Sequence, residues 1–585
     1  MTPTADSYLL LRAFVDELVR CGATDACTSP GSRSTPLVLS LVRDGRLRCH
    51  SHVDERASAF FALGLAKATR RPVPIACTSG TAAAEYLPAV IEAHEAGVPL
   101  VVLTADRPPE LRDVGAGQTV DQIKLYGSAV RWFVDLGIHD ATPTRLRWAR
   151  SLACRVMWAA SGASGRPGPV HVNVPLREPL VLDAPLGPDP RPGRPAGVPW
   201  LARPAAAPAS SAQALTGALT GARRPLVVAG RAEHDPALAG ALAAFAAAAG
   251  APLLADPLSD ARRGAHAVAH YDALLRVPGF GDTHRPDLVV RAGDLPTSKP
   301  LRRWLAGLGE RVVQVALDPE AVWSDPDGVL SAALPGDPAA TLEEAARAAA
   351  DRPAAAGTPP IHAAGRPPAS EWLDGWREAD RAAGAAIAAA LGAGALNEPL
   401  IARTVAGGLG AEHVLFVASS MPVRDVETFA AVRADGPRVL CNRGANGIDG
   451  TVASALGVAA TGTATTLLIG DVALAYDHSA LLAIPRLGLD VTIVLVDNGG
   501  GGIFDFLPVS GETDAYEEHV ATPTGLAPRR IAALYGLEYE RVKDAAGLTA
   551  ALGRPGARLL HAPTDRAGNV ALHRRVWAAV EDAVA

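Results

Sequence analysis

The feature that most constrains this chain is a regular alternation between short apolar runs and longer amphipathic segments. The apolar runs have the length of strands, and in the first part of the chain they lie at residues 25–28, 47–52, 73–77 and 99–104. The amphipathic segments have the spacing of helices and lie at residues 35–43, 55–69 and 82–96. Strand–helix alternation with short connections is typical of parallel sheets, because each return to the next strand requires a crossover. We therefore expect an α/β fold of doubly wound parallel sheets, with helices on both faces.

The length and two Pro-rich stretches divide the chain into three domains. A chain of 585 residues is too long for one hydrophobic core. Two stretches rich in Pro, Ala and Gly, at residues 185–211 and 352–370, interrupt the alternation and are interpreted as linkers. The α/β domains are then residues 1–184, 212–351 and 371–585. Further strands are expected at residues 225–229, 288–291, 312–316, 414–418, 466–469 and 491–496.

Composition excludes several classes of function. The formal net charge of -6 argues against a nucleic-acid partner, since no basic face dominates. The six cysteines are scattered, without a CxxC pair, and the N-terminal residues lack the pattern of a signal peptide, so a cytoplasmic location is expected. The uncharged stretch at residues 237–255 is mostly alanine and is broken by Gly250 and Pro252, which predicts a packed helix and a strand rather than a membrane span.

Polar residues follow two expected strands of the last domain at the spacing of one crossover. The first strand ends at Gly470-Asp471, and the second ends at Asp497-Asn498 before four glycines, Gly499 to Gly502. Carboxyl ends of parallel strands are where open α/β sheets bind ligands. Asp471 and Asn498 offer the hard oxygen ligands that Mg²⁺ prefers, and the carbonyl of Gly500 completes the expected shell. The glycine run allows a diphosphate to approach the backbone.

This arrangement resembles the diphosphate–Mg²⁺ motif of thiamine diphosphate (ThDP) enzymes, in which Mn²⁺ is an alternative metal. Val472 replaces the Gly that usually ends the first part of the motif, and Asp497 replaces an Asn, but neither is expected to be a side-chain ligand. Such enzymes also need a glutamate that hydrogen-bonds the aminopyrimidine ring of the cofactor. Glu55, after the expected strand at residues 47–52, fits this role.

Longer runs in both outer domains are similar to the SEPHCHC synthase family of menaquinone biosynthesis. In the first domain these runs are TSPGSRSTPL, HVDERASAFFALGLAKA, CTSGTAAAEYLPAVIEA and LTADRPPELRDVGAGQTVDQ. In the last domain they are SSMPVRDVE, CNRGANGIDG and DNGGGGIFDFLP. The resemblance implies a pyrimidine-binding first domain, a central domain, a diphosphate-binding last domain, and the substrates 2-oxoglutarate and isochorismate.

The resemblance also implies roles for individual residues. Both substrates are dicarboxylates, and arginine binds carboxylates through two parallel hydrogen bonds. The residues expected to face isochorismate are Ser32, Arg33, Arg107, Gln118 and Lys299. The residues expected to hold the succinyl carboxylate are Ser420, Arg424 and Arg443. Ile448 is expected to force ThDP into its bent conformation, while Ser420, Gly470, Asp471 and Asn498 contact the cofactor.

The sequence departs from the family at one position and is compatible with two alternative functions. The family segment that contains Lys299 continues with Arg, whereas this chain has Pro300, and Arg302 or Arg303 is a possible substitute. One alternative function is another ThDP-dependent 2-oxo acid decarboxylase or carboligase, and the other is a non-catalytic homologue. We also expect a homodimer, or a dimer of dimers, in which Glu55 of one chain and Asp471 of another contribute to the same active site.

Overall fold

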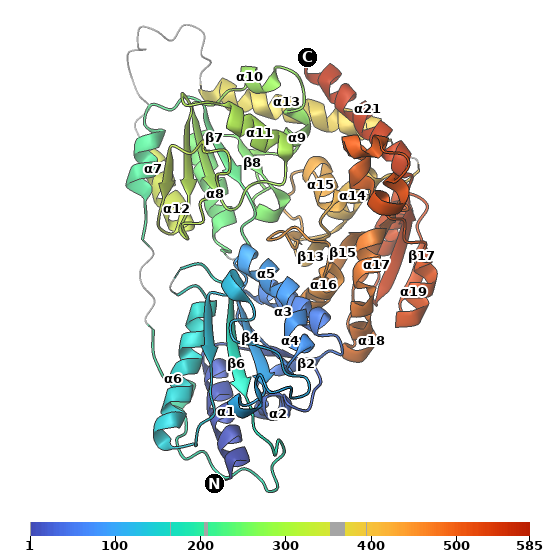
Figure 1. Ribbon diagram of the computed structural model, residues 1–585. Coiled ribbons are helices and arrows are strands. Elements are labelled where there is room, and N and C mark those ends of the chain that lie inside the picture. Colours follow the sequence, from blue (N-terminus) through green and yellow to red (C-terminus); the bar gives the residue numbers. More distant parts are fainter. Residues whose placement is uncertain (1, 164, 204–208, 234, 351–368, 393–394) are drawn as a thin grey trace.

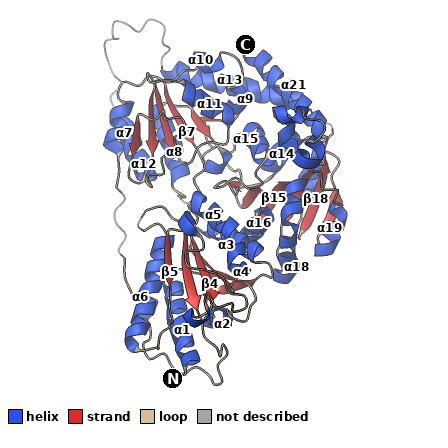
Figure 2. Cartoon of the chain, in the orientation of Figure 1, coloured by secondary structure: helices blue, strands red, loops and turns tan. Residues whose placement is uncertain are grey.

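Three six-stranded parallel sheets form the framework of the protein (Figure 1). The computed structural model describes residues 2–163, 165–203, 209–233, 235–350, 369–392 and 395–585. Helices cover both faces of each sheet, so the expected doubly wound α/β fold is confirmed (Figure 2). The expected linker at residues 352–370 falls mainly outside the described residues, and only its last two residues lie in a described helix.

The first domain has the strand order β2-β1-β3-β4-β6-β5. Its strands are β1 Asp25–Thr28, β2 Arg48–Ser51, β3 Val73–Cys77, β4 Leu100–Asp106, β5 Trp132–Asp135 and β6 Pro169–Pro175. Its helices are α1 Pro3–Arg20, α2 Thr35–Asp44, α3 Glu55–Thr69, α4 Thr81–Glu85, α5 Leu87–Ala96 and α6 Pro143–Ala160. The single helix expected at residues 82–96 is wrong, because α4 and α5 are separated at Tyr86. Pro88 explains the break, since its ring clashes with the carbonyl four residues earlier.

The middle domain has a different strand order, β12-β11-β10-β7-β8-β9. Its strands are β7 Pro225–Ala229, β8 Leu253–Ala255, β9 Ala267–Val268, β10 Leu288–Ala292, β11 Val313–Leu317 and β12 Ala332–Leu334. Its helices are α7 Ala212–Leu219, α8 Leu238–Ala249, α9 Tyr271–Leu274, α10 Phe280–Thr283, α11 Lys299–Gly307 and α12 Pro338–Ala350. The alanine-rich stretch at residues 237–255 forms α8 and β8, as expected. Within the described ranges, every helix is too short or too polar to cross a membrane.

The last domain repeats the strand order of the first, as β14-β13-β15-β16-β18-β17. Its strands are β13 His413–Val417, β14 Arg438–Leu440, β15 Ala464–Gly470, β16 Thr492–Asp497, β17 Glu538–Arg541 and β18 Arg558–Pro563. Its helices are α13 Ala369–Leu391, α14 Glu398–Gly408, α15 Met421–Phe429, α16 Thr451–Ala459, α17 Asp471–Asp477, α18 Ala483–Leu487, α19 Pro528–Tyr535, α20 Ala545–Leu552 and α21 Arg566–Val584. The matching order gives the outer domains equivalent carboxyl edges.

The outer domains of the chain pack directly on each other through α3 and α16. Two glycines permit this close approach: a Cβ at Gly64 would lie 1.9 Å from Ser454 O, and one at Gly457 would lie 2.0 Å from Phe61 O. The buried core is continuous across this contact, since Phe60 and Phe61 belong to the same apolar cluster as α16. Figure 1 shows α3 and α5 of the first domain facing α16 of the last.

The segment at residues 185–203, expected to be a linker, contacts the first domain. The carboxylate of Asp189 pairs with Arg150 at 2.7 Å. The backbone N–H of Trp200 donates to Glu17 Oε2 at 2.8 Å. These contacts hold the segment against α1 and α6 before it reaches the middle domain.

Candidate active site

The polar residues after β15 and β16 meet at one edge of the last sheet. The strands are parallel neighbours, with Gly470 paired to Val496, so Asp471 and Asn498 follow adjacent carboxyl ends. Burial raises the pKa of Asp471 to about 6, and the negative charge of Asp497 adds to the rise. A buried carboxylate next to another acid is stabilised by a cation, so this edge favours metal binding.

The side-chain amide of Asn498 is held so that its oxygen is available to a ligand. Its Nδ2 donates a hydrogen bond to Glu398 Oε1 at 2.8 Å, whereas its buried Oδ1 has no hydrogen-bond partner. A buried acceptor without a partner is costly, and a cation at this point would satisfy it. The residues present therefore fit a hard divalent metal ion.

The glycine loop after Asn498 adopts conformations that side chains rarely permit. Gly499 has φ 74° and Gly500 has φ 141°. A Cβ at Gly500 would lie 2.7 Å from Ala521 O. The carbonyl of Gly500 accepts the N–H of Gly502 at 2.9 Å, which uses one of its two lone pairs.

Glu398 is a site residue that sequence reasoning missed. It begins α14 and is buried, and burial together with the charge of Asp425 raises its pKa to about 7. Its position before Pro399 resembles an ordinary acidic helix start, so only the tertiary contact with Asn498 reveals it. A second supporting pair lies beside it, in which His561 Nε2 contacts Asp497 Oδ2 at 2.8 Å.

Glu55 is the first residue of α3, directly after the helix cap Asp54. Burial is the main cause of its raised pKa, and the charges of Asp54 and Glu85 add to it. Its neighbour Arg56 donates to Tyr476 O at 3.3 Å and pairs with Asp477 at 3.6 Å. In this chain the start of α3 therefore contacts the end of α17 that lies farther from Asp471, about 9 Å along the helix axis.

Two arginines come together at the carboxyl edge of the first sheet. Arg33 is buried and donates to Leu176 O and to Glu178 Oε1, each at 2.9 Å. Burial lowers the pKa of Arg107, and the positive charge of Arg33 lowers it further, which places the two guanidinium groups near each other.

Ser79 connects this arginine pair to Gln118. Its hydroxyl accepts a hydrogen bond from Arg107, and its carbonyl accepts Gln118 Nε2 at 3.0 Å. Ser79 is buried and was not among the expected site residues, although it lies in the quoted run CTSGTAAAEYLPAVIEA. Ser32 is exposed on the same loop as Arg33.

A second group of arginines lies between the middle and last domains. Burial lowers the pKa of Arg424, and the positive charges of Arg443 and Arg302 lower it further. Burial also lowers the pKa of Arg302, with Arg443 as the next cause. Within the described part of the chain, none of the three has a carboxylate at salt-bridge distance. Such a cluster of positive charge favours an anionic ligand.

Three basic residues of α11 were expected as candidates for substrate binding, and only one of them lies near Arg443. Arg302 and Arg443 line a cavity of about 240 Å³, whereas Lys299 and Arg303 are exposed and do not line it. Arg302 is therefore the α11 residue that joins the arginine cluster.

The loops that precede α15 and α16 present the remaining expected residues. Ser420 has φ 73°, a strained value for a residue with a side chain, and its carbonyl accepts a hydrogen bond from Arg424. Glu92 of the first domain accepts the N–H groups of Gly444 and Ala445 at 2.8 and 2.7 Å. These bonds hold the loop that carries Arg443 and the half-buried Ile448.

Comparison with known proteins agrees with this architecture. Residues 10–125 match the family model described as "Thiamine pyrophosphate enzyme, N-terminal TPP binding domain", and residues 426–557 match the corresponding C-terminal TPP binding domain. The fold and these matches together define the chain as a thiamine diphosphate-dependent enzyme.

Full-length relatives narrow the assignment. A protein from Thermobifida fusca is 43% identical, covering 99% of this chain and 99% of its own length. Proteins from Halobacterium salinarum and Geobacillus thermodenitrificans are 42% and 41% identical, covering 97% and 98% of this chain and 97% and 96% of their own lengths. All three are named 2-succinyl-5-enolpyruvyl-6-hydroxy-3-cyclohexene-1-carboxylate synthase. The chain belongs to this family, the SEPHCHC synthases, which confirms the resemblance found in the sequence.

Proposed function

We propose that this protein decarboxylates 2-oxoglutarate and adds the remaining succinyl unit to isochorismate, giving SEPHCHC and CO₂ in menaquinone biosynthesis. When bound, thiamine diphosphate supplies an electron sink for the electron pair left as CO₂ departs. The observation that carries the proposal is the cluster of Arg302, Arg424 and Arg443, which has no carboxylate at salt-bridge distance among the described residues, in a chain of this family. Two dicarboxylate substrates need such fixed positive charge.

Asp471, Asn498 and the Gly500 carbonyl would hold Mg²⁺, with Mn²⁺ as an alternative. The partnerless Oδ1 of Asn498 and the raised pKa of Asp471 support this set. Gly470 and Ser420 would contact the cofactor beside the metal, and Ile448 would press against it. This assignment makes the last domain, residues 371–585, the diphosphate-binding domain.

Glu55 would act on the aminopyrimidine ring from the first domain, residues 1–184. A carboxyl group whose pKa is raised by burial holds and releases a proton nearer to neutral pH than an exposed one. Its role would be to hydrogen-bond the ring nitrogen and so assist proton movement at the neighbouring amino group.

The arginines divide between the two substrates. Arg424 and Arg443, with Ser420, would hold the succinyl carboxylate, and Arg302 would add to them from the middle domain, residues 212–351. Ser32, Arg33, Arg107 and Gln118 would face isochorismate from the first domain. Lys299 is exposed in the single chain and would contact isochorismate only in an assembly that covers α11.

The proposed assembly is a cytoplasmic homodimer, or a dimer of dimers, with each active site shared between chains. Within one chain, the neighbour of Glu55, Arg56, contacts Tyr476 and Asp477 at the end of α17 opposite Asp471. A two-fold arrangement would bring the first domain of a partner to that edge and create two equivalent sites.

CO₂ release measured with each substrate alone and with both together tests the proposed activity. Release from 2-oxoglutarate should require isochorismate, because its ring accepts the succinyl unit. Equal release with 2-oxoglutarate alone would favour the alternative, a simple ThDP-dependent 2-oxo acid decarboxylase. No binding of thiamine diphosphate would favour a non-catalytic homologue.

A further inference from the structure

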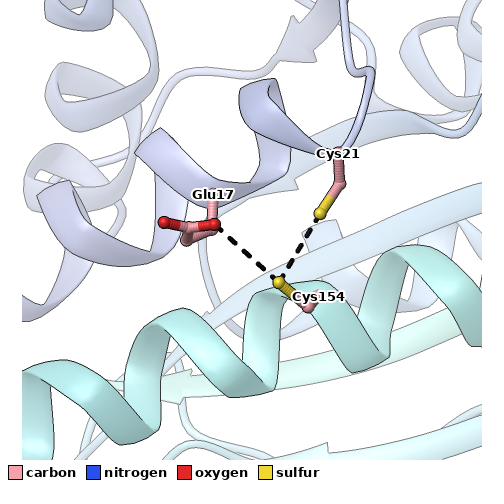
Figure 3. A group of neighbouring side chains, drawn as sticks. All are labelled: Glu17, Cys21 and Cys154. Carbon is pink, nitrogen blue, oxygen red and sulfur yellow. Dashed lines mark hydrogen bonds between the residues drawn. The ribbon is translucent and has the colours of Figure 1, made fainter. Parts of the chain in front are cut away.

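Two cysteine sulfurs lie in contact between α1 and α6, in a part of the first domain that the proposed mechanism does not use. Cys21 directly follows α1, and Cys154 lies within α6. Their Sγ atoms are 3.6 Å apart, and Cys154 Sγ donates to Glu17 Oε2 at 3.8 Å (Figure 3). Among the six cysteines, all of which the structure describes, this is the one sulfur–sulfur contact.

The surroundings of the pair keep it in place. Glu17 is fully buried and pairs with Arg150 at 2.9 Å. It also accepts the N–H of Trp200. Cys154 is fully buried and Cys21 is half-buried, so the pair reaches the surface on the Cys21 side.

The hydrogen bond between the sulfurs makes them chemically unequal. It raises the pKa of Cys21 and lowers the pKa of Cys154, because an S–H of Cys21 that donates to the Cys154 sulfur stabilises its thiolate, although burial and the charge of Glu17 act on Cys154 in the opposite direction. The thiolate is the form that reacts with oxidants, and Cys154 is the sulfur with a donor beside it.

A bound metal ion is a poorer explanation of this cluster. Within the described residues, Glu17, Cys21 and Cys154 are the one group of three or more His, Cys, Asp or Glu side chains whose ligand atoms meet. Glu17 already has its charge compensated by Arg150 and its oxygens engaged, which leaves two sulfur ligands. Structural zinc sites use four.

We propose that Cys21 and Cys154 form a site of reversible oxidation, at which a small hydroperoxide converts the two thiols to a disulfide. The Cys154 thiolate attacks one peroxide oxygen, the O–O bond breaks, and hydroxide leaves and takes up a proton to form water. The Cys21 sulfur then attacks Cys154 sulfur, the S–O bond of the resulting sulfenic acid breaks, and a second water leaves with the Cys21 proton. Two thiols and one hydrogen peroxide thus give one disulfide and two waters, and two electrons pass to the peroxide.

The required movement is small. A disulfide has its sulfurs about 2 Å apart, so the pair must close by about 1.6 Å from its present contact. Cys21 is the C-cap of α1, and its N–H still donates to Glu17 O at 2.9 Å, so the movement would fall mainly on the cysteine side chains.

A disulfide between Cys21 and Cys154 would cross-link α1 and α6, the helices that lead to Arg33 and to the residues that hold its guanidinium group. Helix α1 leads into β1 and then to Arg33, and α6 leads into β6 and then to Leu176 and Glu178, which hold the Arg33 guanidinium. Oxidation is therefore expected to stiffen the first domain without touching the proposed reacting groups.

Mass spectrometry of non-reduced peptides tests the proposal directly. The whole protein is treated with limiting hydrogen peroxide, with glutathione present as a reference thiol, and then digested. We expect a Cys21–Cys154 linked peptide with a loss of about 2 Da relative to the two thiol peptides, reversed by dithiothreitol. The thermal unfolding midpoint should rise on oxidation and return on reduction.

Single substitutions show which cysteines form the disulfide and which of them is oxidised first. Cys21→Ser should abolish the cross-link and leave a Cys154 sulfenic acid, which a dimedone probe traps when the oxidised protein is unfolded in its presence. Cys49→Ser, at another half-buried cysteine, should leave the cross-link intact. Two free thiols at positions 21 and 154 after glutathione has been oxidised would overturn the proposal. So would conversion of Cys154 to a sulfinic acid without a cross-link in the unmodified protein. Neither result depends on the proposed enzymatic activity.

Discussion

The side-chain amide of Asn498 donates to the buried Glu398 carboxylate at 2.8 Å, and this bond fixes which atom of Asn498 remains for a metal ion. With Nδ2 engaged, the partnerless Oδ1 is the oxygen available at the edge shared with Asp471. Glu398 lies 100 residues earlier in the chain, at the start of α14. It therefore acts as a positioning residue for the proposed ligand.

We predict that Glu398→Ala weakens Mg²⁺-dependent binding of thiamine diphosphate by roughly 10- to 100-fold, the usual cost of losing a residue that orients a metal ligand. Glu398→Gln should retain much of the affinity, because its amide oxygen still accepts from Asn498 Nδ2. Isothermal calorimetry with Mg²⁺ and the cofactor measures both. Equal affinity for the Ala variant and the unmodified protein would show that the orientation of Asn498 does not matter.

We predict that the buried carboxyl group of Asp477 makes the stability of the protein depend on pH. It is fully buried, and burial raises its pKa to about 7, although Arg56 pairs with it at 3.6 Å. Because the folded pKa lies above the unfolded value, the folded state keeps a proton that the unfolded state has lost. Stability from this group is present below about pH 4 and is lost as the pH rises to about 7, by an amount on the order of 4 kcal/mol.

The matched variant for this prediction is Asp477→Asn. Its amide oxygen still accepts the Ala453 N–H that Asp477 accepts at 3.0 Å, but it does not titrate. Thermal unfolding of the apoprotein between pH 4.5 and 8 should fall less steeply in the variant. Parallel curves would assign the pH dependence to other groups.

The strands, and the edge at which Asp471 and Asn498 meet, were predictable from the sequence because their signals are local. Strand β3 was expected at residues 73–77 and occupies Val73–Cys77, and Asp471 and Asn498 follow their strands as expected. Glu398 was not predictable, since a helix-start acid has the same sequence pattern whether or not it contacts Asn498. The choice of Arg302 over Arg303 likewise depends on how α11 rotates against the last domain, which no local pattern records.

We predict that Glu55→Gln leaves the fold and cofactor binding largely intact and lowers turnover by at least about 100-fold, since it removes a group proposed for proton movement. Turnover with saturating cofactor, together with calorimetry, measures this. Near-normal turnover would remove Glu55 from the site.

Subunit mixing tests whether the site is shared. Asp471→Ala should be inactive through weak metal and cofactor binding, and Glu55→Gln through lost proton movement. If the two variants exchange subunits, a mixed dimer contains one site with both residues intact, and activity should return. Exchange without recovered activity would place each site within a single chain.

We predict that the two groups of arginines affect the binding of different substrates. Arg424→Ala and Arg443→Ala should raise the KM for 2-oxoglutarate by roughly 10- to 100-fold, the cost of one charged hydrogen-bonding partner. Arg33→Ala and Arg107→Ala should mainly raise the KM for isochorismate. Steady-state kinetics with each substrate varied in turn measures the division, and equal effects on both substrates in all four variants would contradict it.

Two neighbouring arginines of α11 provide a test variant and a control variant for the arginine cluster between the middle and last domains. Arg302→Ala should raise a substrate KM, because Arg302 lines the cavity with Arg443, whereas Arg303→Ala at the exposed neighbouring position should not. The same loss in both variants would indicate a general effect on α11 instead of a contribution to the anion site.

The most direct test of the proposed activity is identification of the product by mass spectrometry after incubation with thiamine diphosphate, Mg²⁺, isochorismate and uniformly ¹³C-labelled 2-oxoglutarate. We predict a product with the mass of SEPHCHC that carries four labelled carbons, with the fifth released as CO₂. A labelled four-carbon aldehyde or acid with isochorismate unchanged would contradict the proposed activity.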